Sequence, residues 1–421
     1  MTIANKNTFP YIKALEINDC YAYQNLSVLI NDDESIPFKH LILTGKNGSG
    51  KTTVLNFLNK NLKKIIIQNE DIYKKITQHK VSIENVHNNI RYKNNWKKEI
   101  KELEQTLPFF LNDISFFTIS KREDILLTHF KASRVTKLEK VKGSTAYEDV
   151  INHLNNQNSQ ENFRKKLKQY LVNKKVSQAF SQIKGNQKEV NSIESFFNTF
   201  EEVLRNIFED KNITLSFDDK GYEFYINLSG NRQITFNEFS DGFSAFINII
   251  LDLFTRVDII REKVKDYTYE PCGFVLIDEP ETHLHLELQY QVLPILTSLF
   301  PNLQFIVATH SPAVISSIKN ATVYDLSTQK TVADWIVGSS YSELMMTHFG
   351  LENEYSNIAD DIIETTQELV DNQKMSPAKK LEKLKNLFDE NQKYLSPSLR
   401  LSLEVQVLKL ENQLLTTTIN D

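Results

Sequence analysis

Residues 45–52 read GKNGSGKT and lie between two segments of different character. The preceding segment 38–44, FKHLILT, is apolar and predicts a strand, and the segment from Lys51 to about Leu62 predicts a helix. A strand, a loop of the form GxxxxGK[ST] and a helix in this order are typical of a phosphate-binding loop. The glycines let backbone N–H groups turn inward around a phosphate, and the helix N-terminus adds a positive dipole end. A chance glycine turn before a helix is the alternative, and the complete match disfavours it.

The loop predicts ATP and Mg²⁺ as cofactors. Lys51 is expected to bridge the β- and γ-phosphates and to act in catalysis, and the Thr52 hydroxyl to bind Mg²⁺. The residues expected to contact the nucleotide here are Gly45, Asn47, Gly48, Ser49, Gly50, Lys51, Thr52 and Thr53.

An acidic pair follows the apolar segment 274–277, FVLI. A buried strand that ends in Asp278 and Glu279 is costly unless the charges have a function or a partner. We expect Asp278 to hold Mg²⁺ through water, and Glu279 to accept a proton from the water that attacks the γ-phosphorus. The alternative, acidic residues that favour a helix N-terminus, is weakened by the P-loop upstream.

A histidine follows a second apolar segment, 305–309, FIVAT. The carboxyl ends of parallel strands form the ligand-binding edge of an open α/β sheet. His310 at this edge is expected to bind the γ-phosphate and to orient the water. A structural histidine is the alternative.

Bulk composition sets wider limits. The 421 residues carry a formal net charge of −5, so nucleic-acid binding would need a local basic patch. The two cysteines, Cys20 and Cys272, are far apart, which suits a reducing compartment and gives no metal-ligand spacing. We find no apolar leader at residues 1–19 and no run of about 18 apolar residues, so we expect a cytoplasmic protein without membrane contact.

The rest of the chain alternates between strand-like and helical patterns. The pattern predicts helices in two polar insertions, about 68–108 and 145–210, and a helix from about Gly242. Predicted strands are residues 11–19, 23–31, 114–119, 125–131, 213–217 and 222–228. Beyond about residue 340 we expect helices, two of which begin at Ser376-Pro377 and Ser396-Pro397. The final segment 399–415 alternates like a strand at first, but its caps and length favour a helix.

Two further motifs carry a family resemblance. Residues 239–243, FSDGF, resemble a degenerate ABC signature, LSGGQ, in which Ser240 and Gly242 match and Asp241 and Phe243 depart. Residues 278–285, DEPETHLH, resemble RecF/SMC-like and OLD-type ATPases rather than membrane transporters, with Thr282 to His285 in the D-loop.

The chain thus resembles ABC-type P-loop ATPases of bacterial anti-phage defence. It is most similar to the ATPase subunit PtuA of Septu systems, which also occurs beside retrons. The resemblance implies an α/β fold with a mixed sheet: an ATPase head at 1–335 with helical insertions, and a helical region at 336–421 for assembly or partner docking. It also implies a homodimer or higher homo-oligomer, in which Ser240 and the Gly242 N–H face ATP held by another copy. Asp241 would bring negative charge near the triphosphate, which favours slow turnover.

The resemblance further implies a separate nuclease subunit, of the HNH rather than the TOPRIM class. The residues after 330 are too few and too helical for a TOPRIM fold, so we expect no nuclease in this chain. Alternatives that stay open are a RecF-like repair ATPase acting directly on DNA and a scaffold without turnover. A transporter ATPase is a further alternative, but the DEPETHLH string and the degenerate signature argue against it. DNA contact would use basic residues at 164–175 or the Trp96 region, 92–101. Gln68 is a candidate Q-loop residue, and Tyr23 is either a core aromatic or an adenine contact.

Overall fold

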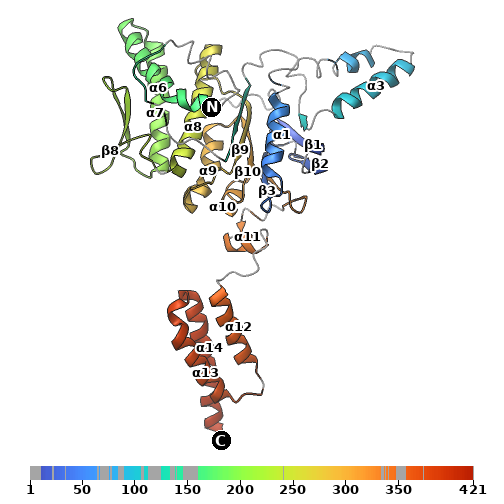
Figure 1. The fold of residues 1–421 in the computed structure, drawn as a ribbon, viewed down its shortest axis with the longest axis vertical. Coiled ribbons are helices and arrows are strands. Elements are labelled where there is room, and N and C mark those ends of the chain that lie inside the picture. The colour runs from blue at the N-terminus through green and yellow to red at the C-terminus, as the bar shows by residue number, and fades with distance from the viewer. Residues whose placement is uncertain are drawn as a thin grey trace. The chain divides into compact units, whose positions relative to one another are not determined.

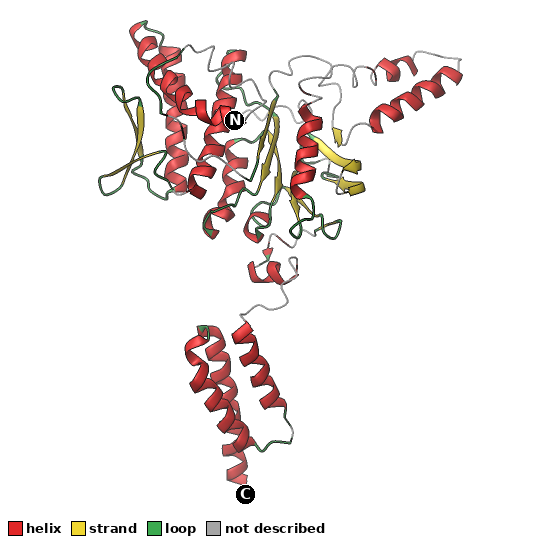
Figure 2. Ribbon diagram, viewed as in Figure 1, coloured by secondary structure: helices red, strands yellow, loops and turns green. Residues whose placement is uncertain are grey.

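A computed structural model gives the fold (Figures 1 and 2). The residues that it describes are 11–20, 23–33, 35–63, 66, 75, 78–83, 90–105, 109–111, 125–132, 138, 140–145, 160–239, 241–332, 336, 338–339, 341–347, 357–372 and 374–420. They fall into two compact units, Met1–Ser339 and Ser340–Asp421. Within these ranges, no helix has the length and apolar character needed to cross a bilayer.

A six-stranded mixed sheet forms the centre of the first unit, which confirms the predicted α/β class. Its strand order is β12-β11-β3-β10-β9-β5. All neighbouring strands are parallel except β11 and β12. The strands are β3 (His40–Thr44), β5 (Leu126–Phe130), β9 (Gly273–Asp278), β10 (Leu303–Ala308), β11 (Ala321–Asp325) and β12 (Lys330–Thr331). β3, β9 and β10 are buried along their whole length, which explains their nearly continuous apolar runs.

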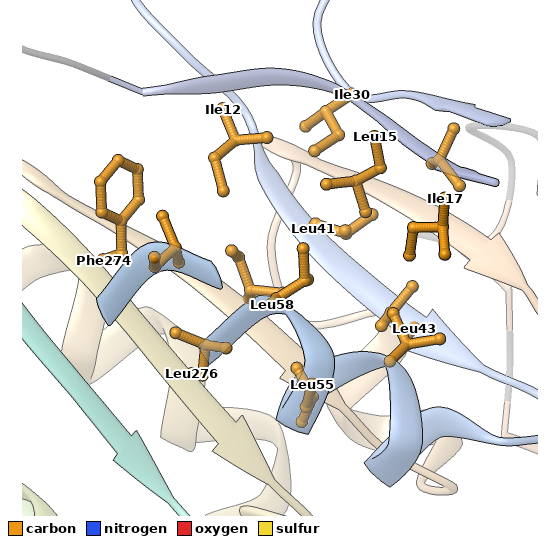
Figure 3. Close-up of a cluster of buried hydrophobic side chains, with 14 of the residues drawn as sticks. Ile12, Leu15, Ile17, Ile30, Leu41, Leu43, Leu55, Leu58, Phe274 and Leu276 are labelled. Atoms are coloured by element: carbon orange, nitrogen blue, oxygen red, sulfur yellow. The ribbon is translucent and has the colours of Figure 1, made fainter. Parts of the chain in front are cut away.

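A small antiparallel sheet packs over the central one. It has the order β2-β1-β4, from β1 (Ile12–Cys20), β2 (Tyr23–Leu29) and β4 (Phe109–Leu111), so the predicted strand pair near the N-terminus is confirmed. Helix α1 (Lys51–Lys63) buries Leu55 and Leu58 in the core that both sheets share (Figure 3). The apolar face of α1 therefore fixes how the helix packs, with its first residues, Lys51 and Thr52, at the end of the P-loop.

A helical lobe with its own small sheet follows β5. It contains α6 (Gln160–Ile183), α7 (Gln187–Ile207), α8 (Asp241–Val264) and the antiparallel strands β6 (Thr214–Asp218), β7 (Glu223–Leu228) and β8 (Arg232–Thr235). Phe200 of α7 packs against Phe236 and against Phe254 of α8, with ring centroids 5.9 and 6.4 Å apart. This aromatic core holds the lobe together. Helices α9 (Leu286–Leu299) and α10 (Pro312–Ile315) follow β9 and β10.

The two predicted helical insertions are described in part. The first contains α3 (Ile90–Gln105), and the second contains α6 and α7. The strand predicted at 114–119 lies outside the described residues.

The second unit is helical, as predicted. Its elements are α11 (Tyr341–Thr347), α12 (Asn357–Asp371), α13 (Pro377–Asn391), the 3₁₀ turn η4 (Gln392–Tyr394) and α14 (Pro397–Asn420). Both predicted Ser-Pro helix starts are confirmed, although only Ser396 caps through its side chain, accepting a 3.3 Å bond from the Leu399 N–H. The ambiguous final segment is helical.

Candidate active site

The P-loop backbone depends on its glycines. Gly45, Gly48 and Gly50 have φ angles of 131°, 80° and 84°, which disfavour residues with a side chain. At Gly45 a Cβ would also lie 2.7 Å from the Ser327 hydroxyl and 2.9 Å from an Asp325 carboxylate oxygen. A side chain at position 45 would therefore displace the side-chain oxygens of residues 325 and 327 from the loop.

Lys51 is buried at the first turn of α1 and folds back over the loop. Its Nζ donates to the carbonyls of Gly45 at 2.9 Å and Lys46 at 3.1 Å. Burial lowers the pKa of Lys51, and the charges of Glu279 and Asp278, in that order, oppose the shift. The ammonium is thus held at the loop centre, where a β- or γ-phosphate would replace the carbonyl acceptors.

Thr52 and Asp278 bring the P-loop and the acidic strand end together. The Thr52 hydroxyl donates to a carboxylate oxygen of Asp278 at 2.8 Å, across 226 residues of sequence. Two hard oxygens this close suit Mg²⁺, which usually takes one or two protein oxygens and completes its shell with water and phosphate. Among the described residues, no group of three or more His, Cys, Asp or Glu side chains is placed to hold a metal ion.

Glu279 stands in a strained turn at the end of β9. Its φ is 48°, unusual for a residue with a side chain, and its N–H donates to the Ala308 carbonyl at 2.8 Å. The Thr282 hydroxyl donates to the Glu279 carbonyl at 2.9 Å and closes the turn. These contacts hold the backbone of Glu279, from which its side chain extends at the sheet edge.

His310 follows β10 at the same sheet edge and is half-buried. Burial lowers the pKa of His310, the positive charge of Lys51 lowers it further, and Glu279 partly opposes the shift. The lowered pKa favours the neutral imidazole.

Glu281 is a residue of this site that the sequence analysis did not single out. Its Oε1 accepts from the Thr309 hydroxyl at 2.6 Å and from the His310 N–H at 2.9 Å, so it ties the ends of β9 and β10 together. Burial raises the pKa of Glu281, and its buried Oε2 has no hydrogen-bond partner. The sequence signal that could have identified Glu281 is its position as a second carboxylate two residues after Glu279.

The other residues predicted to contact the nucleotide lie in the P-loop and in the first turn of α1. Asn47 is exposed at the loop tip, Ser49 is 3.5 Å from the Lys51 ammonium, and Thr53 is half-buried in α1. Tyr23 packs against the core, and its hydroxyl donates to the Ser49 carbonyl and, at 3.2 Å, to that of Leu326. Tyr23 therefore supports the P-loop backbone from the core side. This agrees with the alternative that Tyr23 is a core aromatic and not an adenine contact.

The signature residues are described in part. Ser240 and Gln68 lie outside the described residues. Gly242, in the first turn of α8, packs so closely on the D-loop that a Cβ would lie 2.2 Å from the His283 carbonyl oxygen. His283 itself has a φ of 62°. The signature end of α8 and the turn that carries Glu279 are thus in direct contact.

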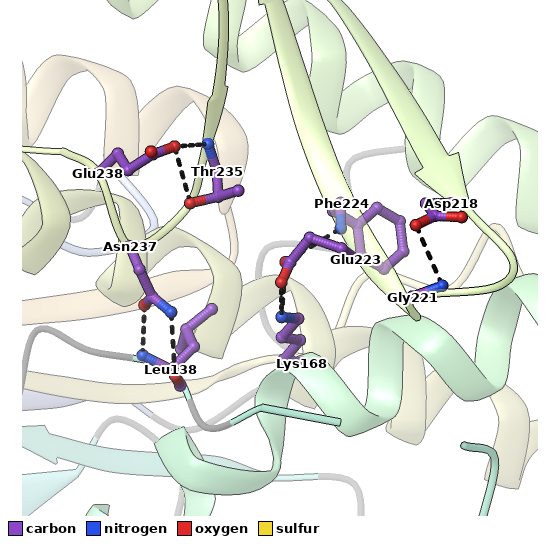
Figure 4. Close-up of polar contacts among 9 residues, drawn as sticks. All are labelled: Leu138, Lys168, Asp218, Gly221, Glu223, Phe224, Thr235, Asn237 and Glu238. Carbon is purple, nitrogen blue, oxygen red and sulfur yellow. Dashed lines mark hydrogen bonds and ion pairs between the residues drawn. The ribbon is translucent and has the colours of Figure 1, made fainter. Parts of the chain in front are cut away.

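The prediction that the basic segment 164–175 could contact DNA is wrong for two of its lysines. Lys168 is 2% exposed and hydrogen-bonded to Glu223 at 2.6 Å (Figure 4). Lys174 is 4% exposed and lies 2.6 Å from Glu262. Both ammonium groups thus pair with partly buried carboxylates of the lobe. Near Trp96, in contrast, Lys97 and Lys98 of α3 are exposed.

The strand order, the P-loop and the two polar strand ends define a P-loop ATPase head. The family model described as "AAA domain, putative AbiEii toxin, Type IV TA system" matches residues 41–316, and the chain belongs to this family of ABC-type ATPases.

Individual relatives match over shorter stretches. A protein named "Retron Vc95 probable ATPase" from Vibrio cholerae is 32% identical over 91 residues, 22% of this chain and 18% of that protein. A "Septu protein PtuA" from Bacillus thuringiensis is 32% identical over 101 residues, 23% and 24% of the two chains. The matches thus span less than a quarter of either relative.

Solved structures are more distant. An Smc head bound to a winged-helix domain of ScpA aligns with a TM-score of 0.38 and 13% identity, covering 77% of this chain and 95% of that one. RecF aligns with a TM-score of 0.30 and 10% identity, covering 77% and 98%.

Proposed function

We propose that this chain binds Mg²⁺·ATP and hydrolyses it, as the ATPase subunit of a cytoplasmic anti-phage defence complex. The observation that carries the proposal is the 2.8 Å bond between Thr52 and Asp278, which joins a phosphate loop to an acidic strand end. The named retron and Septu relatives support the defence setting.

Each residue of the site has a role in this proposal. The backbone of 45–50 and the Lys51 ammonium hold the phosphates, and Thr52 and Asp278 hold the magnesium ion, which supplies charge neutralisation when bound. Glu279 accepts the proton of the attacking water, a contribution of about 10²–10⁴-fold in such reactions. Neutral His310 orients that water. Glu281 is a positioning residue, because it holds the backbone on which His310 sits.

The signature completes the site from a second copy. Ser240 and the N–H of Gly242 in one copy face the γ-phosphate held by the other, in a two-fold dimer or a higher oligomer built from such pairs. The contact between Gly242 and His283 supports a coupling of this interface to the turn of Glu279. Asp241 adds negative charge beside the triphosphate, and slow turnover follows from it.

The effector in this proposal is a separate nuclease, of the HNH rather than the TOPRIM class. ATP binding and hydrolysis shift the ATPase between closed and open states, and the nuclease responds to that shift. The helical region from 336 onward is the proposed docking element, and α3 is the proposed point of DNA contact.

A Glu279→Gln variant tests the catalytic assignment. It keeps the shape of the side chain but loses the base, so ATP should bind, remain unhydrolysed and stabilise the oligomer. Lys51→Ala is the matched control and should lose binding itself. Equal hydrolysis by wild type and Glu279→Gln would show that Glu279 is not the base.

A further inference from the structure

Helix α14 is apolar on two opposite faces. Leu399, Leu403 and Leu410 are buried, on the side that packs against α13. Glu411 marks the edge of that side with a 2.6 Å ion pair to Lys385 of α13. This face of α14 is therefore buried within the second unit itself.

The opposite face carries Leu401, Val405 and Leu408, which are 62%, 41% and 55% exposed. Because each residue of an α-helix turns by about 100°, these three side chains form one stripe, on the side away from Leu403. A continuous exposed stripe of large apolar residues marks an interaction surface rather than scattered surface residues.

The spacing of the stripe is that of a coiled coil. Positions 401, 405, 408 and 412 alternate between steps of four and three residues. In heptad terms, Leu401 and Leu408 occupy d, and Val405 and Asn412 occupy a. Leucine at d with a β-branched residue at a favours a parallel two-stranded coil, and a single asparagine at a fixes the register.

The flanks of the stripe are complementary in charge. Glu404 occupies a g position and the exposed Lys409 the following e position. In a parallel pair, each g residue meets the e residue five positions further on in the other helix. Glu404 of one copy would thus meet Lys409 of the other, twice by symmetry. Within the single chain, Glu404 is 44% exposed and lies 3.4 Å from Arg400. Its side chain can therefore turn toward Lys409 of a second copy.

We propose that α14 pairs in parallel and in register with α14 of a second copy. Antiparallel pairing fits less well. Layers of an a residue against a d residue would set Val405 against Leu408 but Leu401 against Asn412, so a leucine would face an amide at both ends of the stripe. The paired tails hold two chains together without nucleotide. They raise the effective concentration of the second head, whatever closes the heads themselves.

The first test is the mass of the full chain in the absence of nucleotide, measured by light scattering. Wild type should have twice the mass of one 48.9 kDa chain. Leu401→Lys with Leu408→Lys should give the single-chain mass, with unchanged helix content because both positions are exposed. Lys51→Ala should stay a dimer, which separates this inference from the proposed ATP site. A wild type of single-chain mass at tens of micromolar would overturn the proposal.

Cysteine cross-linking tests the orientation. The native residues Cys20 and Cys272 are buried and leave a single introduced thiol exposed. Val405→Cys and Leu408→Cys should each form disulfide-linked dimers upon oxidation, and Arg400→Cys, off the stripe, should not. Dimers in which only one of these two variants cross-links, or neither does, would overturn the parallel arrangement.

Charge exchange tests the register. Glu404→Lys alone, or Lys409→Glu alone, sets like charges opposite each other and should weaken the dimer several-fold. The double exchange should restore wild-type dimerisation. A double variant as weak as the single ones would contradict the Glu404–Lys409 pairing.

Discussion

The carboxylate of Glu281 accepts a 2.6 Å hydrogen bond from the Thr309 hydroxyl, and this bond links the two strand ends that carry Glu279 and His310. The same Oε1 accepts from the His310 N–H at 2.9 Å. The proposed base and the proposed water-orienting histidine are thus held relative to each other by a third residue.

Replacing Glu281 tests this positioning role. Glu281→Ala leaves two donors without their acceptor, which costs about 1–3 kcal/mol for a buried group. We expect a lower melting temperature and a lower kcat with little change in KM for ATP. Glu281→Gln keeps an acceptor oxygen and should retain most of the activity. Equal damage from both substitutions would point to a role for the charge itself.

Gly45 and Gly48 offer a matched pair in the P-loop. Both have positive φ, but a Cβ at Gly45 meets the Ser327 hydroxyl at 2.7 Å, whereas one at Gly48 meets nothing within 4 Å. Gly45→Ala should therefore abolish ATP binding. Gly48→Ala bears only the backbone strain, about 1–2 kcal/mol. Nucleotide titration of both purified variants checks this, and a Gly45→Ala variant that binds ATP like wild type would refute the crowding argument.

We expect Gly242 to couple movements of the signature to the D-loop. A Cβ there would lie 2.2 Å from the His283 carbonyl oxygen, a main-chain atom that cannot move alone. Gly242→Ala should reduce kcat at least tenfold while ATP binding to the P-loop of the same chain persists. Loss of binding together with turnover would show that the substitution disrupts the head as a whole.

His40 makes stability depend on pH. Burial lowers the pKa of His40 to about 4, and its Nδ1 accepts a 3.1 Å bond from the Phe305 N–H. The unfolded chain, with a pKa of about 6.5, therefore binds the proton first as pH falls. The contribution of neutral His40 to the free energy of unfolding is complete above about pH 6.5 and declines as the pH falls toward 4. The loss is about 2 kcal/mol at pH 5. Denaturant unfolding at pH 7 and 5 measures the loss.

The control for this prediction is His40→Asn. The amide oxygen of asparagine can replace Nδ1 as acceptor but does not titrate. The variant should lose part of the difference between pH 7 and pH 5. An unchanged difference would assign it to another group, such as His129, whose pKa burial also lowers to about 4.

Sequence reasoning found the parts of the site that lie in local patterns. The P-loop is one contiguous motif, and Asp278 and His310 each end an apolar run that the parallel sheet buries. The strand order was not predictable, since nothing local to β3 shows that it lies between β10 and β11. Glu281 was missed because its partners, Thr309 and His310, are far away in sequence. Lys168 and Lys174 were wrongly predicted to face solvent, because a run of lysines looks the same in sequence whether it faces solvent or pairs with carboxylates inside the lobe.

The most direct test of the central claim, an ATP site built from two copies, is complementation between two inactive variants. Lys51→Ala lacks the phosphate contact and Ser240→Arg blocks the signature. When the two are co-expressed with different tags and purified as mixed dimers, each dimer keeps one intact P-loop opposite one intact signature. The account predicts that mixed dimers regain about half of wild-type ATPase activity, because one of two symmetric sites is whole. Mixed dimers as inactive as either variant alone would contradict it.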